Sequence, residues 1–135
     1  MSELKIVNPT SLRIPTKSYS QGIVIPLGAA DLMFITGQVA QNIEGEVIAP
    51  NDAEAQTRVI YNRLSDILAG ADMTLDNVVK AQIFLTDIAD GPIVSKVRDE
   101  IFKVAKPVST LVEVNNLVKP GCCVEIELTA VRFNS

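Results

Sequence analysis

The spacing of apolar residues along this chain changes several times between the alternation of a strand and the three- and four-residue spacing of a helix. Six segments favour strands and two favour helices, in the order strand, strand, strand, helix, strand, helix, strand, strand. Two helices can cover one face of a single sheet. The 135 residues are therefore expected to form one mixed domain, 1–135, large enough to fold without disulfides.

The strand expectations rest on short runs rich in β-branched residues. The expected strands are 5–7, 21–26, 32–36, 78–85, 110–114 and 123–131. In the fourth strand, alternation places Val79, Ala81, Ile83 and Leu85 on the buried face. In the last strand, Val124, Ile126, Leu128 and Ala130 share one face, and Cys123, Glu125, Glu127 and Thr129 share the other.

The first expected helix begins after Asn51, which has the spacing of a capping box to Glu54, and ends near Gly70. The second runs from about 92 to 104 with Pro92 in its first turn. Its apolar stripe contains Ile93, Val97 and Ile101, flanked by Val94 and Val104.

The second face of the sheet has no helix to cover it. Phe84, Val78, Cys123 and Val131 are expected there among polar residues. The hydrophobic fraction of 47%, counted without the 7 glycines, is also slightly high for a single domain. A partly apolar face without cover favours contact between subunits.

Composition excludes several kinds of function. With 12 basic and 16 acidic residues the net charge is −4, which argues against nucleic-acid binding. The chain has no histidine, so triads and metal sites built on histidine are excluded, and we expect no metal and no cofactor.

The expected location is the cytoplasm. Cys122 and Cys123 are adjacent and therefore poorly placed to pair, which favours a reducing compartment. Residues 1–9 lack the pattern of a signal peptide, and no apolar run approaches the roughly 20 residues of a membrane span.

Glu125 and Glu127 are the first candidates for chemistry, because their carboxylates emerge on one face of a strand about 7 Å apart. Such a pair can divide the roles of acid and base, or it can lie on a solvated strand face. Tyr19, in a polar loop, is either a binding platform or an anchor. Gly37, after Thr36, either admits a ligand close to the backbone or only ends its strand.

Four segments together resemble the RidA family, also called the YjgF or L-PSP endoribonuclease-like family. They are Tyr19-Ser20-Gln21, Thr36-Gly37-Gln38, the 70–79 stretch Gly-Ala-Asp-Met-Thr-Leu-Asp-Asn-Val-Val, and Val124-Glu125-Ile126-Glu127. The resemblance covers the whole chain. It implies an α+β, chorismate-mutase-like fold with one mixed six-stranded sheet, two helices on one face, and a homotrimeric barrel with a ligand cleft at each subunit interface.

The resemblance also implies residue roles. Glu125 matches the residue that positions or activates water, Tyr19 lines the pocket, and Glu127 has a structural role. Ser109 replaces the arginine of a Pro-Ala-Arg-Ser/Thr motif that grips the substrate carboxylate. Ser95 matches an asparagine, Thr36 matches a serine, and Gly37 and Leu111 complete the expected substrate-binding set.

Three functions follow from the resemblance. The first is a trimer that binds a small imine or enamine and, if it is an enzyme, hydrolyses it. Its activity as a 2-imino-acid deaminase would be reduced, because Ser109 cannot reproduce the bidentate grip of a guanidinium on a carboxylate. The second is a ligand-binding or regulatory protein without catalysis. The third is a ribonuclease or translation inhibitor, against which the net charge and the lack of histidine argue.

Overall fold

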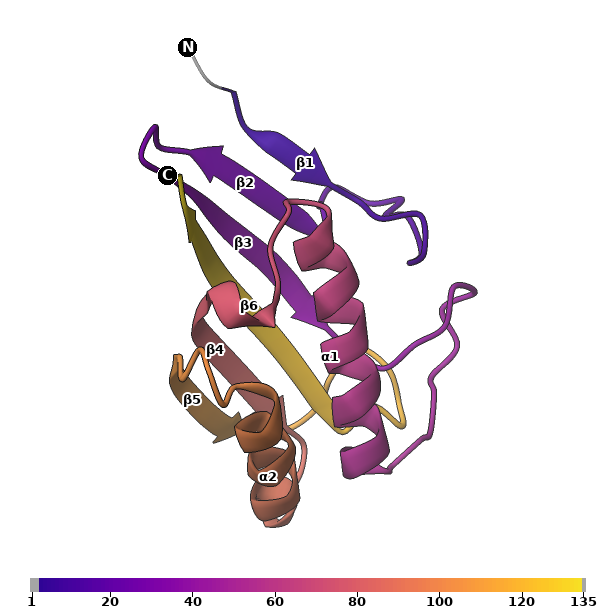
Figure 1. Cartoon of the computed structure of the whole chain (residues 1–135). Helices are drawn as coiled ribbons and strands as arrows, with labels where there is room; N and C mark the ends of the chain where they lie inside the picture. Colours follow the sequence, from indigo (N-terminus) through magenta and orange to yellow (C-terminus); the bar gives the residue numbers. More distant parts are fainter. Residues whose placement is uncertain (1–2, 135) are drawn as a thin grey trace.

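The computed structural model of the chain describes residues 3–134. Two α-helices, α1 (Ala53–Ala69) and α2 (Gly91–Ile101), lie on one face of a six-stranded sheet (Figure 1). The strands are β1 (Lys5–Val7), β2 (Gly22–Pro26), β3 (Ala30–Gln38), β4 (Val78–Leu85), β5 (Val108–Glu113) and β6 (Val124–Phe133). Short 3₁₀ helices, η1 (Leu75–Asn77) and η2 (Ile88–Asp90), precede β4 and α2. The α+β fold and the predicted order of strands and helices are confirmed.

The sheet is mixed, with the strand order β1-β2-β3-β6-β4-β5. β4 and β5 are parallel and the other neighbours are antiparallel. A parallel pair needs a crossover connection, and α2 supplies it between β4 and β5. The last strand, β6, thus lies between β3 and β4 in the middle of the sheet, with Glu125 at its start.

The core lies between the two helices and the sheet. Ile60 and Leu64 from α1 and Val97 from α2 are fully buried, and they belong to one cluster with Met33 of β3 and Ile126 of β6. Tyr61 adds an edge-to-face contact with Phe102, with ring centroids 5.4 Å apart. Burial of these side chains gives the fold its main stabilisation.

The expected alternation in β4 is wrong at its first residues. Val79 is 45% exposed, whereas Val78 is 2% exposed and joins the core. The pairing of β4 with β6 shifts register between Val78 and Lys80. One extra residue at such a bulge moves the preceding side chain to the other face.

Cys123 was also expected on the uncovered face, and this is wrong because it precedes β6. It is 6% exposed and lies in the core, where its backbone N–H donates to Gln56 Oε1 at 2.9 Å. Phe84 and Val131 alternate with buried residues of their strands, as expected, and are half-buried.

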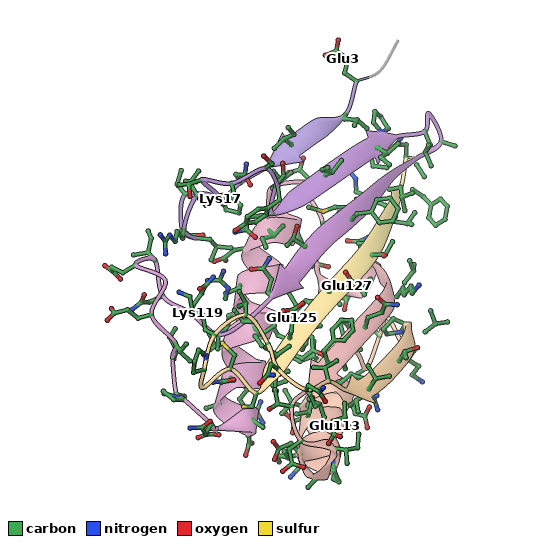
Figure 2. All side chains as sticks on the ribbon, turned by 180° about the vertical axis from the view of Figure 1, so that it is seen from behind. Glu3, Lys17, Glu113, Lys119, Glu125 and Glu127 are labelled. Carbon is green, nitrogen blue, oxygen red and sulfur yellow. The ribbon has the colours of Figure 1, made fainter. Side chains whose placement is uncertain are left out.

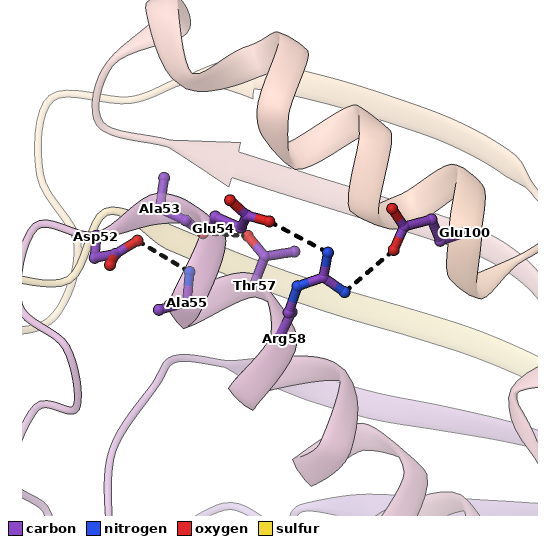
Figure 3. A network of polar contacts seen from close by, with 7 residues as sticks. All are labelled: Asp52, Ala53, Glu54, Ala55, Thr57, Arg58 and Glu100. Carbon is purple, nitrogen blue, oxygen red and sulfur yellow. Dashed lines mark hydrogen bonds and ion pairs between the residues drawn. The ribbon is translucent and has the colours of Figure 1, made fainter.

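Helix boundaries differ from the sequence expectations by a few residues. Asp52, not Asn51, is the N-cap of α1, and its side chain accepts from the Ala55 N–H at 3.0 Å (Figure 3). Asn51 instead has a positive φ of 63°, which a residue immediately before the cap can adopt. Gly70 is the C-cap, as expected. α2 ends at Ile101, so Val104 lies outside it and is 73% exposed.

Arg58 joins the two helices at their exposed side. Its guanidinium contacts Glu54 one turn earlier on α1 at 3.2 Å and Glu100 on α2 at 3.1 Å (Figure 3). The three side chains are 43–48% exposed, so this network adds little to stability.

The face of the sheet opposite the helices carries a continuous row of side chains. Strand register aligns one residue from each of the six strands: Ile6, Ile23, Phe34, Thr129, Lys80 and Val108. Ile6, Phe34 and Val108 are 61%, 48% and 69% exposed. This row, apolar at four of its six positions and without cover in this chain, fits a surface for another protein chain. Within residues 3–134, no helix is both long and apolar enough to cross a membrane.

Candidate functional site

A pocket of about 630 Å³ opens where the end of β3 and the start of β6 meet two loops. Its walls come from 13–21, 36–41, 118–119, Arg63 and Glu125. We refer to it as the Glu125 pocket. Figure 2 shows Glu125 on β6 with Lys119 beside it and Lys17 in the first loop. Four of the predicted site residues line this pocket within one chain: Tyr19, Thr36, Gly37 and Glu125.

Glu125 is the acidic side chain of this pocket, and it is half-buried. Its carboxylate packs directly on Gly37, where a Cβ atom would lie 2.5 Å from Oε2. Burial raises the pKa of Glu125 above its ordinary value, and the charge of Glu127 raises it further. A carboxylate with a raised pKa can accept a proton from water more readily, as a general base requires.

Glu127 lies in a different environment on the same strand. It lines a separate hollow of about 200 Å³ on the uncovered face, with Phe34 and Lys80. The two carboxylates, although two residues apart, therefore open to different spaces. Glu125 alone faces the loops that carry Tyr19.

Tyr19 is held in place by backbone contacts to the end of β3. The hydroxyl of Thr36 donates to the Ser20 carbonyl at 2.5 Å, and the Thr36 N–H donates to the Gln21 carbonyl at 2.9 Å. The N–H of Gln21 in turn donates to Asn8 Oδ1 at 2.9 Å. Thr36 thus positions the Tyr19 loop, and its one hydroxyl proton is used within the chain. Tyr19 itself is 52% exposed and free to contact a ligand.

A buried polar network in the wall of the pocket was not predicted from the sequence. Gln38 Nε2 donates to Gln21 Oε1 at 2.7 Å and to the Thr36 carbonyl at 2.8 Å, which turns Gln38 Oε1 toward Arg63. Gln21, Gln38 and Arg63 are 4%, 2% and 6% exposed. The signal was available, because Arg63 lies three residues after Ile60 and four before Ile67, at a position of the apolar stripe of α1.

Three predicted site residues lie elsewhere in the chain. Ser109 pairs with Ala81 on the helix-covered face, where its hydroxyl is 3.5 Å from Arg98 Nη1, at a second cavity of about 660 Å³. Leu111 packs against the core, and Ser95 is half-buried on α2. Within one chain, none of these three residues lines the Glu125 pocket.

The two cysteines lie next to each other in the sequence, just before β6. Cys122 and Cys123 are free and buried, and burial raises the pKa of both thiols, that of Cys123 to about 11. Thiols of this kind are poor nucleophiles at neutral pH. Among residues 3–134, no group of three or more histidine, cysteine, aspartate or glutamate side chains is placed to hold a metal ion.

Comparison with known proteins places this geometry in a family. The family model described as Endoribonuclease L-PSP matches residues 10–132. The chain is 34% identical over 107 residues to the 3-aminoacrylate deaminase RutC of Acinetobacter baylyi, covering 78% of this chain and 84% of that protein.

Two solved structures are similar over nearly the full length. The Rid family protein YyfA from Yersinia pestis has a TM-score of 0.84 and 30% identity, with 95% of this chain and 98% of that chain covered. E. coli TdcF with bound serine has a TM-score of 0.80 and 26% identity, with the same coverage of 95% and 98%. The matched segments include Tyr19, Thr36, Gly37 and Glu125, and the chain belongs to the RidA/YjgF/L-PSP family.

Proposed function

We propose that this protein is a hydrolase that converts a small imine or enamine to a carbonyl compound and ammonia in the Glu125 pocket. The observation that carries the proposal is a half-buried carboxylate with a raised pKa, which packs on Gly37 and lines, together with Tyr19, a pocket of about 630 Å³. A relative at 34% identity is a 3-aminoacrylate deaminase, which supports the same class of reaction here.

Glu125 would act on water in this reaction. Its carboxylate accepts a proton from a water molecule while the water oxygen bonds to the imine carbon, and the protonated Glu125 then gives that proton to the nitrogen. The carboxylate next accepts the hydroxyl proton of this adduct and passes it to the nitrogen as the carbon–nitrogen bond breaks and the carbonyl forms. Ammonia leaves, Glu125 is again a carboxylate, and one water is consumed for each ammonia released. Tyr19 would contact the ligand from its loop in the wall of the same pocket, where the Thr36 contacts to Ser20 and Gln21 hold the loop.

The working form would be a homotrimer of single-domain subunits, with the uncovered sheet faces packed together and the pocket completed at each interface. The exposed apolar row that includes Ile6, Phe34 and Val108 supports this assembly. We expect the trimer in the cytoplasm, where the two free thiols stay reduced. Light scattering coupled to size exclusion should give three times the mass of 14.6 kDa, and a monomer would contradict the assembly.

A second candidate is a ligand-binding protein without turnover. It is favoured by Ser109, which the family resemblance matches to the arginine that grips the substrate carboxylate and which contacts Arg98 within its own chain. The related TdcF has been solved with bound serine, which shows that such a fold can hold a small amino acid.

Ammonia release separates the two candidates. A pyridoxal-phosphate dehydratase acting on serine or threonine generates the imine in the presence of an excess of this protein. The enzyme proposal predicts faster ammonia release than in buffer with the dehydratase alone. A rate equal to that control, together with saturable binding of serine, would contradict hydrolysis of these substrates and favour the binding protein.

A further inference from the structure

Arg63 is a buried cation whose hydrogen-bond partners are all neutral. Nε and Nη2 donate to Gln38 Oε1 at 3.3 and 2.9 Å, and Nη1 donates to the Gln41 carbonyl at 2.8 Å. A guanidinium has five N–H donors, so these three contacts leave donors free. The side chain is 6% exposed, yet it lines the Glu125 pocket. Arg63 therefore places, at the wall of the pocket, a guanidinium with more N–H donors than acceptors within the chain.

The other arginines show what Arg63 lacks. Among the described residues, Arg58, Arg98 and Arg132 each have a carboxylate within 3.2 Å. Arg13 and Arg63, the two arginines that line the pocket, have none within 4.0 Å. Asp66, on the next turn of α1, accepts from the Ser11 hydroxyl at 3.1 Å and acts on Arg63 only through its charge, from beyond 4.0 Å. Burying a charge is costly unless a counter-charge accompanies it.

The pocket as a whole has the opposite charge balance to the chain. Four of the 12 basic residues line it and one of the 16 acidic residues does, although the chain carries a net charge of −4. Arg13 and Lys119 donate to the carbonyls of Glu44 and Gly45, which are again neutral acceptors. A concave site with this balance attracts small anions.

We propose that Arg63 is the anion-binding residue of the Glu125 pocket and holds the carboxylate of a small ligand. The planar guanidinium offers two parallel donors to a carboxylate, a geometry that lysine lacks. Gln38 fixes the orientation of the guanidinium, because its own amide is held by Gln21 and the Thr36 carbonyl. The identity of the substrate as an imino acid rests on the proposed function, whereas anion binding by Arg63 stands without it.

Pyruvate is a suitable probe, because it is a small carboxylate of the product class, and pyruvamide is its neutral counterpart. Dissociation constants are measured calorimetrically at low salt for the full chain and for Arg63→Gln, Arg63→Lys and Arg58→Gln. Arg58→Gln is the matched control, since Arg58 lies on the same helix and outside the pocket. Thermal unfolding of each variant verifies that it is folded.

The expected result is that Arg63→Gln weakens pyruvate binding at least about tenfold, as loss of a charge-assisted hydrogen bond requires. Arg63→Lys should retain part of the affinity, Arg58→Gln should retain all of it, and pyruvamide should bind weakly to every variant. Unchanged pyruvate affinity in folded Arg63→Gln would overturn the proposal. If that variant does not fold, wild-type affinity in Arg63→Lys would overturn it instead.

Further outcomes separate carboxylate binding by Arg63 from phosphate binding and from the proposed hydrolase activity. Inorganic phosphate that binds more tightly than pyruvate at Arg63 would overturn the assignment of a carboxylate. Pyruvate binding that depends on Arg63 without any ammonia release would leave the anion site intact and contradict the hydrolase. Ammonia release with the same KM in Arg63→Gln as in the wild type would support the hydrolase and contradict anion binding by Arg63.

Discussion

The carboxylate of Glu125 occupies the space that a side chain at position 37 would need. A Cβ atom on Gly37 would lie 2.5 Å from Oε2 and 3.0 Å from the carboxyl carbon of Glu125. Gly37 does not have a positive φ, so its backbone is open to other residues. The glycine is therefore required by the position of the carboxylate and not by the conformation of the strand.

Gly37→Ala should lower activity with little effect on stability. The new methyl group must displace the carboxylate, and a misplacement of about 1 Å can reduce a rate by as much as 10²-fold. Steady-state ammonia release and thermal unfolding measure the two effects. Gly91→Ala is the matched control, because its nearest neighbour, Leu111 Cδ2, is 4.0 Å away. Equal activity in the two alanine variants would argue against a precise role for the carboxylate.

Glu125 should make the protein less stable at neutral pH than at acid pH. Burial raises its pKa in the folded state, so the folded state holds this proton more tightly than the unfolded state does. The contribution of protonated Glu125 to the free energy of unfolding is complete below the ordinary glutamate pKa of about 4.3. It is lost as the pH rises through the raised pKa of the folded state. Chemical denaturation should show Glu125→Gln at least as stable as the wild type at pH 7, with the advantage vanishing at about pH 4. A stability advantage of Glu125→Gln over the wild type that grows as the pH falls would contradict a raised pKa of Glu125.

Tyr61 carries a hydroxyl group that is buried without a hydrogen-bond partner among the described residues. Tyr61→Phe should raise the free energy of unfolding by about 1 kcal/mol, because a polar group that lost its solvation is removed. Tyr61→Leu should lower it, because the edge-to-face contact with Phe102 disappears as well. Denaturant unfolding compares the two variants. A destabilised Tyr61→Phe would show that the hydroxyl has a partner in solution.

Gln56 connects the start of β6 to the loop before α1. It is fully buried, its Nε2 approaches the carbonyls of Ile48, Ala49 and Gly121 within 3.2 Å, and its Oε1 accepts from Cys123. Gln56→Ala should reduce the free energy of unfolding by at least about 3 kcal/mol, because several buried backbone groups lose their partner. The neighbouring exposed pair offers a contrast, since Arg58→Ala should cost less than about 1 kcal/mol. A similar loss in the free energy of unfolding for both variants would contradict the claim that the buried hydrogen bonds of Gln56 contribute more than the exposed ion pairs of Arg58.

Much of the fold followed from periodicity in the sequence. The helix that contains Ile60 and Leu64 and the strand that contains Ile126 were predicted because their patterns are long and regular. The exposure of Val79 was not predicted, because a bulge depends on how β4 pairs with a distant strand. The cap at Asp52 was missed by one residue, because two adjacent residues can both serve as caps.

The candidate site was predicted only in part. Glu125 was a candidate from its spacing to Glu127 and Tyr19 from its place in a polar loop, the family resemblance supplied their roles, and both line the pocket. Arg63 was missed. Periodicity identifies the apolar positions of α1, but it does not reveal the hydrogen-bond partners of a charged residue that lies among them. Ser109 was assigned to the ligand, whereas within one chain it lies near Arg98 on the helix-covered face. Side-chain partners that come from distant segments require the tertiary structure.

The central claim is that Glu125 performs chemistry, and a matched pair of variants tests it most directly. Glu125→Gln and Glu127→Gln remove one negative charge each from the same strand, two residues apart, with almost no change in shape. In the coupled dehydratase assay, Glu125→Gln should lower kcat/KM for ammonia release by about 10²-fold or more, the usual contribution of a general base. Glu127→Gln should stay close to the wild type. Ammonia release at the wild-type rate from folded Glu125→Gln would contradict the account.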